Sequence, residues 1–191
     1  MRNYYKKLTD DDFEIIPFAY LGDSREMSKY IKHRLDVVRK FIGRDISGLK
    51  TLDVGGYNKF GELLGTTHNT LPYDHNFRIE APSDDYDIIF NFEIIEHLMN
   101  PLFMMIELRE LLKPDGRMYI STPRPFFGFL QGPEHFTEYK PHRFERMMKF
   151  AGWKIVKRKK FGLWDRDFFY WGIRPFFRVL FHRTYIWEIK L

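Results

Sequence analysis

The sequence has 191 residues, of which 44% are hydrophobic and 30% charged, a balance typical of a single globular domain. It contains no cysteine, which excludes disulfide bonds and thiolate metal sites, and no uninterrupted apolar run long enough to span a bilayer. The net charge of +5 is uneven, because nine Lys and Arg but only three Asp and Glu lie between Lys157 and Leu191. That basic end is a candidate surface for a partner.

Helical and strand patterns alternate along most of the chain. In chain order, we predict a helix over 24–42, a strand over 49–54, a helix over 59–64, strands over 68–73 and 86–92, a helix over 93–112, a strand over 118–122, a helix over 141–151 and strands over 153–161 and 184–191. Residues 1–22 carry no regular pattern and no signal-peptide pattern. The alternation indicates a parallel sheet with helices on both faces.

Capping and turn residues mark the ends of several predicted elements. Asp23 is the predicted N-cap of the first helix. Asn100-Pro101 is a potential break in the third helix, and LKPDGR, residues 112–117, is composed of residues that favour a turn. Pro123 is expected to stop the strand before it, with a long loop to follow.

Two glycines in TLDVGGYNKF, residues 51–60, stand where a predicted strand passes into a helix. In parallel α/β sheets, ligands bind outside the carboxyl ends of the strands, near the switch in strand order. Glycines there let the backbone approach a ligand that a Cβ would block, although a tight turn alone would also use them. Neither G-x-x-x-x-G-K-[ST] nor G-x-G-x-x-G occurs, so a ligand without phosphates fits better than a nucleoside triphosphate or a dinucleotide.

TLDVGGYNKF resembles the first motif of the class I S-adenosylmethionine-dependent methyltransferases. YDIIFNFEIIEHLMNPLFMMIELRELLKPDGRMYISTP, residues 86–123, resembles the family's following block, which runs from the fourth strand through an E-x-x-E-H segment to the fifth strand. PEHFTEYKPHRFERMMKFAGW resembles the loop and helix that come next in the methyltransferase-type 11/23-like subgroup. The resemblance covers roughly residues 48–160. It implies a Rossmann-like, doubly wound, mainly parallel sheet in three α/β/α layers, with a C-terminal antiparallel strand.

By this resemblance, S-adenosylmethionine would be bound by Asp53, Gly55, Gly56, Asn58, Asp74, Phe92 and Glu93. The glycine loop is about one residue shorter than the family's D-x-G-x-G-x-G form. Only residues 75–85 separate Asp74 from Tyr86, where the family places a helix and a third strand, so we predict that this region is trimmed and holds no full helix. Asp74 is then the expected carboxylate for the ribose hydroxyls or the adenine amine; a solvated turn aspartate is the alternative.

A sulfonium methyl group is already electrophilic, so the protein must align the acceptor and, for a hydroxyl, help to remove its proton. His135, in the loop after the fifth family strand, is the predicted catalytic base or acceptor-positioning residue. No metal site is assigned. On a helix, Glu93, Glu96 and His97 would share one face and, with His135, would form a less favoured set of ligands for a divalent cation.

The aromatic and basic C-terminal end is longer than the short link that joins the last two strands in the family. FGLWDRDFFYWGIRPFFRVLFHRTYIW combines eleven aromatic residues with four arginines. Packing on the sheet, an acceptor pocket and a segment resting on an anionic membrane are the alternatives for 162–183. We therefore divide one methyltransferase domain, 1–191, into an N-terminal helical cap (1–47), a cofactor-binding core (48–160) and this end (161–191).

The predicted function is S-adenosylmethionine-dependent O-methylation of a sugar or lipid-linked glycan intermediate. We expect a cytoplasmic protein, with a peripheral place at the inner membrane face as an extension. Methylation of RNA is an alternative that the basic tail and the E-x-x-E-H pattern favour. A non-catalytic binding module is the alternative of another class, which the shortened glycine loop supports.

Overall fold

The computed structural model describes residues 24–124, 135–162, 173–181 and 183–191. The predicted irregular segment 1–22, the predicted N-cap Asp23 and most of the predicted loop after Pro123 lie outside these residues. Trp164, Phe168 and the other aromatic residues of 163–172 also lie outside them.

Six strands form one sheet in the order β2-β1-β3-β4-β6-β5. Their bounds are β1 Thr51–Asp53, β2 His68–Asn69, β3 Tyr86–Phe92, β4 Leu112–Arg124, β5 Lys154–Phe161 and β6 Arg183–Lys190. Strands β1 to β4 pair in parallel, whereas β6 is antiparallel to both of its neighbours, β4 and β5. The predicted mainly parallel sheet with an antiparallel C-terminal strand is confirmed.

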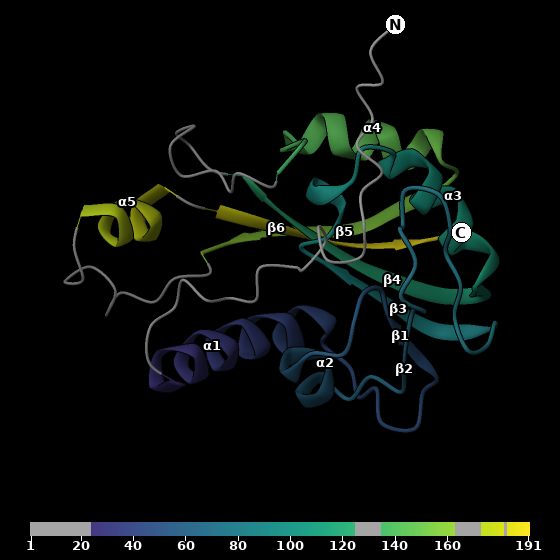
Figure 1. Ribbon diagram of the computed structural model, residues 1–191, viewed down its shortest axis with the longest axis horizontal. Helices are drawn as coiled ribbons and strands as arrows, with labels where there is room; N and C mark the ends of the chain where they lie inside the picture. The colour runs from purple at the N-terminus through teal and green to yellow at the C-terminus, as the bar shows by residue number, and fades with distance from the viewer. Residues whose placement is uncertain (1–23, 125–134, 163–172, 182) are drawn as a thin grey trace, which may run out of the picture.

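Helices cover both faces of this sheet, as the alternating pattern predicted (Figure 1). Helices α1 (Ser24–Ile42) and α2 (Lys59–Leu64) lie below the sheet in this view, and α3 (Pro101–Glu110) and α4 (Pro141–Phe150) lie above it. The last helix, α5 (Ile173–Phe181), immediately precedes β6. Because Arg124 at the end of β4 pairs with Arg183 at the start of β6, α5 lies at the carboxyl end of the parallel strands.

Each face of the sheet has its own hydrophobic core. The core under α1 and α2 contains Leu35, Val38, Phe41, Ile42, Phe60, Leu64, Ile88, Phe90, Phe92, Tyr119 and Ile186. The core under α3 and α4 includes Leu52, Ile89, Met104, Met105, Leu108, Ile120, Phe144, Met148, Trp153 and Trp187. In β3, Ile88 and Phe90 face one core and Ile89 the other, as the two-residue period of a buried strand requires.

The helix predicted over 93–112 is wrong in its first half. Residues 95–97 form only a single 3₁₀ turn, and α3 begins at Pro101 after its N-cap, Asn100. The Asn100 side chain accepts a hydrogen bond from the Phe103 amide at 3.4 Å. Proline suits the first turn of a helix, so Asn100-Pro101 is the start of the helix and not a break inside it.

Strand β4 is longer than predicted at both ends. Leu112 pairs with Tyr86 and Arg117 with Ile88, so the predicted LKPDGR turn is a bulge within the strand. At the other end, β4 passes through Pro123 to Arg124, and the expected stop is wrong. The last residue of β4 that pairs with β3 is Ser121, and beyond it, within the described residues, β4 pairs only with β6. Proline is tolerated there because one side of the strand has no neighbouring strand among these residues to receive a hydrogen bond.

The trimmed region behaves as predicted. Residues 75–85 contain neither a helix nor a strand, and β2 is the outermost strand next to β1. The segment is held by its own hydrogen bonds and by Asn76, whose Oδ1 accepts from the Met99 and Asn100 amides at 2.7 and 2.8 Å. Within the described part of the chain, no helix is both long enough and apolar enough to cross a membrane.

Candidate functional site

Six of the predicted site residues, Asp53, Gly55, Gly56, Asn58, Phe92 and Glu93, lie where the strand order switches, at the carboxyl ends of β1 and β3. Asp53 ends β1, and Glu93 follows β3. From β1 the chain leads outward to β2, while β3 lies on its other side and leads to β4. Ligands of doubly wound sheets bind at such a switch point.

The turn after β1 contains two glycines with different surroundings. The backbone at Gly55 requires glycine, whereas Gly56 borders open space. Gly55 has φ +129°, and a Cβ there would lie 3.2 Å from Ile94 Cδ1. The Gly55 amide donates to Thr70 Oγ1 at 2.8 Å, which ties the turn to the end of β2. A Cβ on Gly56 would meet no atom within 4 Å, and its φ is ordinary. A side chain at Gly56 would therefore point into open space, and the contact of Gly56 with the cofactor stays a prediction.

Asn58 connects the turn to Asp53. Its Oδ1 accepts from the Gly61 amide at 2.8 Å and so caps α2, while its Nδ2 donates to Asp53 Oδ2 at 3.0 Å. Burial raises the pKa of Asp53 to about 6, against the opposing effects of the Asn58 hydrogen bond and of the Arg34 charge. Asn58 thus has a positioning role beneath the turn, which the sequence did not indicate.

Gly61 is a site residue that the sequence analysis missed. A Cβ at this position would lie 2.6 Å from Asp53 Oδ2 and 3.0 Å from Thr66 Oγ1. The absence of a side chain lets α2 approach the end of β1 closely. The available signal was a glycine inside a short predicted helix, where this residue is unfavourable unless packing requires it.

Alanine at Gly61 is expected to lower the free energy of unfolding by about 1–2 kcal/mol, because its methyl group overlaps the Asp53 carboxylate. Inside an unconstrained helix the same change would stabilise by about 1 kcal/mol. Urea unfolding of the parent and of Gly61→Ala shows whether the alanine lowers or raises the free energy of unfolding. A more stable alanine variant would show that α2 does not need this close approach.

Arg34 on α1 is the second residue that the sequence analysis missed. It is 7% exposed, and its guanidinium lies 4.6 Å from the centre of the Phe60 ring and 5.9 Å from that of Phe92. Its charge opposes the rise in the pKa of Asp53 and of Glu93 that burial causes. Phe92 points inward and packs on Phe60 with a centroid distance of 5.8 Å. The available signal was a single arginine among the apolar residues Ile31, Leu35 and Val38, which share one face of the first predicted helix.

The loop after β2 places His75 nearer to the glycine turn than the predicted Asp74. Asp74 is exposed, and its Oδ1 accepts from the amide and side chain of Asn76 at 2.9 and 2.8 Å. His75 Nε2 lies 2.9 Å from Thr70 Oγ1, the same oxygen that accepts from Gly55. Burial lowers the pKa of His75. A cofactor contact of Asp74 remains a prediction.

Glu96 is buried and Glu93 is half-buried, and both lie beside two histidines. Glu93 has φ +58°, and its Oε1 accepts from Ser121 Oγ at 2.7 Å. The His97 and His135 rings are in edge contact, with centroids 4.9 Å apart. Burial raises the pKa of Glu93 and, more strongly, that of Glu96. The predicted shared helix face is wrong, because a strand end and a 3₁₀ turn hold these residues together instead.

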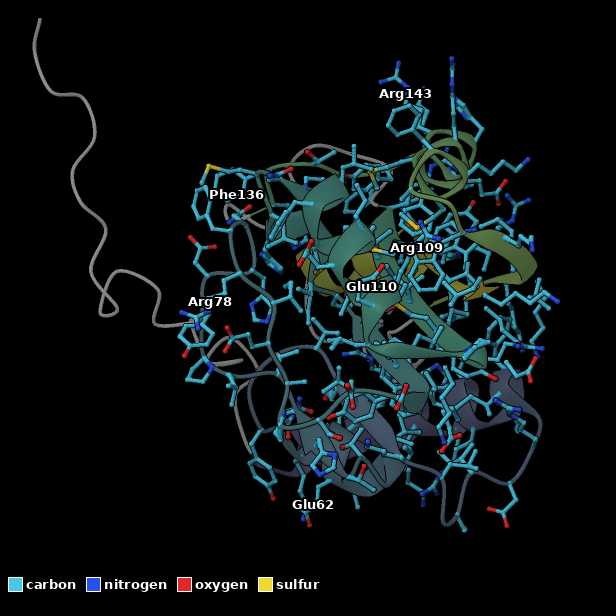
Figure 2. All side chains as sticks on the ribbon, turned by 90° about the vertical axis from the view of Figure 1, so that its right-hand side faces the viewer. Glu62, Arg78, Arg109, Glu110, Phe136 and Arg143 are labelled. Carbon is cyan, nitrogen blue, oxygen red and sulfur yellow. The ribbon has the colours of Figure 1, made fainter. Side chains whose placement is uncertain are left out.

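His135 lies in the segment that follows β4, as predicted for the acceptor side. Its Nδ1 is 2.9 Å from Glu138 Oε1, and the two side chains are 14% and 9% exposed. The amides of Phe136 and Thr137 donate to the Glu96 carbonyl at 2.8 and 3.2 Å, which ties this segment to the 3₁₀ turn. Figure 2 shows Phe136 on the same side of the molecule as Arg78, which belongs to the loop after β2.

A family model described as Methyltransferase domain matches residues 24–158. A ubiquinone biosynthesis O-methyltransferase of Roseobacter denitrificans is 30% identical over 87 residues, which are 42% of this chain and 35% of that protein. A protein of the same name from Cereibacter sphaeroides is 34% identical over 67 residues, or 33% of this chain and 27% of its own length. These matches therefore span about a third of the relatives' length.

Solved structures share the fold at low sequence identity. An S-adenosylmethionine-dependent methyltransferase from Mesorhizobium loti has a TM-score of 0.58 and 14% identity, over 82% of this chain and 100% of its own. The [4+2]-cyclase SpnF has a TM-score of 0.59 and 11% identity, over 88% and 84% of the two chains. The family model matches most of the chain, and the strand order agrees with it. The chain therefore belongs to the class I S-adenosylmethionine-dependent methyltransferases.

Proposed function

We propose that the protein transfers the methyl group of S-adenosylmethionine to a hydroxyl oxygen. The observation that carries the proposal is that His135, with Glu138 at 2.9 Å, belongs to a segment bonded to the 3₁₀ turn after β3, whose carboxyl end lies beside the glycine turn that follows β1. The cofactor's methyl group would then point from the turn toward the segment after β4. O-methyltransferases among the relatives support oxygen as the acceptor atom.

The acceptor that we propose is a sugar or lipid-linked glycan intermediate with an apolar part. Phe77, Met99 and Phe136 are large apolar side chains that are 72%, 60% and 65% exposed. Phe77 lies in the loop after β2, Met99 between the 3₁₀ turn and α3, and Phe136 in the segment after β4. Asn76 joins the first two of these segments through its hydrogen bonds with the Met99 and Asn100 amides. Apolar residues beside the proposed acceptor position suit an acceptor that is only partly polar.

Helix α5 supports a role of the C-terminal end on the acceptor side. It lies beyond the carboxyl ends of the parallel strands, and Phe177 stacks on Phe181 with ring centroids 5.9 Å apart. Phe176 contacts Phe177 edge-on at 5.6 Å and is 39% exposed. Aromatic faces of this kind bind sugar rings or acyl chains. We propose that 162–183 contributes to the acceptor pocket and not to the cofactor pocket.

Calorimetry with S-adenosylmethionine and S-adenosylhomocysteine tests the first part of this proposal. One site per chain is expected, with the product analogue competing for it. An absence of binding would favour a non-catalytic module instead. Transfer of a labelled methyl group from the cofactor to glycan-lipid extracts and, separately, to RNA then identifies the acceptor class, since RNA binding should weaken steeply with salt.

Replacement of His135 by asparagine is expected to lower kcat at least tenfold, because the group that we place against the acceptor hydroxyl is lost. The amide of asparagine can still donate to Glu138. Affinity for S-adenosylmethionine should stay within about twofold, which is roughly 0.4 kcal/mol. Steady-state kinetics and calorimetry on the same preparation make the comparison.

The matched control is His142→Asn, since His142 is exposed on the first turn of α4. This variant should retain both kcat and cofactor affinity. Equal kcat values for the His135 and His142 variants would contradict a role of His135 in methyl transfer.

A further inference from the structure

We infer that Glu96, His97 and His135 bind a divalent transition-metal cation. One carboxylate oxygen and one nitrogen from each imidazole all lie within 4.8 Å of one another. Ligands around one zinc ion, each at about 2.0–2.2 Å, are less than about 4.4 Å apart. Small side-chain rotations therefore bring the three atoms onto a single ion.

The Glu96 carboxylate is the main reason to place a cation here. Its side chain is fully buried, and neither of its oxygens makes a hydrogen bond of ordinary geometry among the described residues, although the Thr122 hydroxyl lies close to the carboxylate. Burying a carboxylate without a partner is costly unless a positive charge or a proton compensates it. A cation bound by Glu96 and the two adjacent imidazoles would provide both the charge and the missing bonds.

His135 has the second partner that metal-binding imidazoles usually have. Its Nδ1 lies 2.9 Å from Glu138 Oε1, an arrangement that fixes the ring and makes it a stronger metal ligand. Two backbone hydrogen bonds, from Phe136 and Thr137 to the Glu96 carbonyl, hold this segment beside the 3₁₀ turn. The ligands come from two segments far apart in the sequence, yet the backbone keeps them in place.

The ligand types select the cation. Two imidazoles with one carboxylate suit Zn²⁺, Mn²⁺ or Co²⁺, whereas Mg²⁺ and Ca²⁺ prefer oxygen ligands throughout. Three protein ligands leave at least one coordination position for a water molecule or an acceptor oxygen. A hydroxyl bound there would lose its proton more easily, a role that rests on the proposed O-methylation.

A direct test uses Co²⁺ and Zn²⁺ alone, without cofactor or acceptor. The protein is first dialysed against a chelator, and Co²⁺ binding is then followed by visible absorption and Zn²⁺ binding by calorimetry. We expect one ion per chain, and a higher unfolding temperature with the ion than without it. Glu96→Gln, His97→Asn and His135→Asn should each weaken binding at least tenfold, while His142→Asn should bind as the parent does.

Glu96→Gln also shows whether the loss of binding is local. Because it removes a buried charge and keeps the side-chain shape, the metal-free variant should unfold at or above the temperature of the metal-free parent. The inference is overturned if the parent binds neither ion above the level of a chain lacking all three ligands. It is also overturned if the three single variants bind like the parent. Neither result would affect cofactor binding at the glycine turn, which calorimetry tests separately. The kcat of Glu96→Gln distinguishes the two roles of His135, because this variant weakens metal binding and leaves the imidazole in place.

Discussion

Asp53→Asn is expected to raise the free energy of unfolding at pH 7.5 by up to about 3 kcal/mol. Burial raises the pKa of Asp53 from 3.8 to about 6 in the folded protein. The folded state therefore holds the proton more tightly than the unfolded state, and stability falls as the pH rises from about 4 through 6. A difference of about two pKa units corresponds to about 3 kcal/mol above that range. Asparagine removes the ionised carboxylate and still presents an oxygen to Asn58.

The same variant should bind S-adenosylmethionine more weakly, because Asp53 is one of the residues predicted to bind the cofactor at the end of β1. Urea unfolding at pH 4.5 and 7.5, with calorimetry at pH 7.5, measures both effects. The gain in stability should be small at pH 4.5, where the parent's Asp53 is already protonated in the folded state. A gain of equal size at both pH values would contradict the assignment.

Asp87→Asn is the matched control, for which we expect the opposite change in the free energy of unfolding. Asp87 lies 2.7 Å from Lys113 Nζ and accepts from the Lys50 amide at 2.9 Å, and these contacts lower its pKa. Its contribution to stability is present above its ordinary pKa and is lost as the pH falls through the folded value. The asparagine variant should therefore be less stable than the parent at pH 7.5.

Gly56→Val is expected to weaken S-adenosylmethionine binding about 100-fold, or about 2.7 kcal/mol. The position has an ordinary φ, and a Cβ would meet no protein atom within 4 Å. A valine there fills only space that the cofactor is proposed to occupy. The unfolding temperature without ligand should change little. Calorimetry gives the affinity, and thermal unfolding shows whether the fold is retained.

Gly162→Val provides the matched control, because a Cβ at Gly162 makes only an ordinary 3.6 Å contact with Arg183 and its φ is also unstrained. This variant lies after β5 and should bind the cofactor like the parent. Gly55→Val is a poorer test, since φ +129° strains any side chain at that position. Unchanged affinity in Gly56→Val would place the cofactor elsewhere.

Local patterns in the sequence were sufficient for the elements whose residues interact with near neighbours. YDIIFNF predicted β3 at its observed bounds, because an apolar run of strand length between turn residues has few other solutions. Pro141 predicted the start of α4, since proline suits the first turn of a helix. The short interval before Tyr86 predicted the trimmed region, because residues 75–85 are too few for a helix and a strand.

Contacts between distant segments decided the rest of the site. Arg34 meets Phe60 and Phe92 only after α1 packs on the sheet. Gly61 matters only because α2 approaches Asp53.

The sequence alone was enough to predict a glycine turn after β1 and a site that contains acidic residues and histidines. Their arrangement was decided by the tertiary structure. Glu96 and His135 are 39 positions apart and are joined by backbone hydrogen bonds from Phe136 and Thr137 that no local pattern contains. Helical periodicity predicted a shared face for Glu93, Glu96 and His97, yet the chain adopts a strand end and a 3₁₀ turn there. Packing of the segment after β4 against that turn determines which side chains meet, since burial and pairing of polar groups depend on every segment that surrounds them.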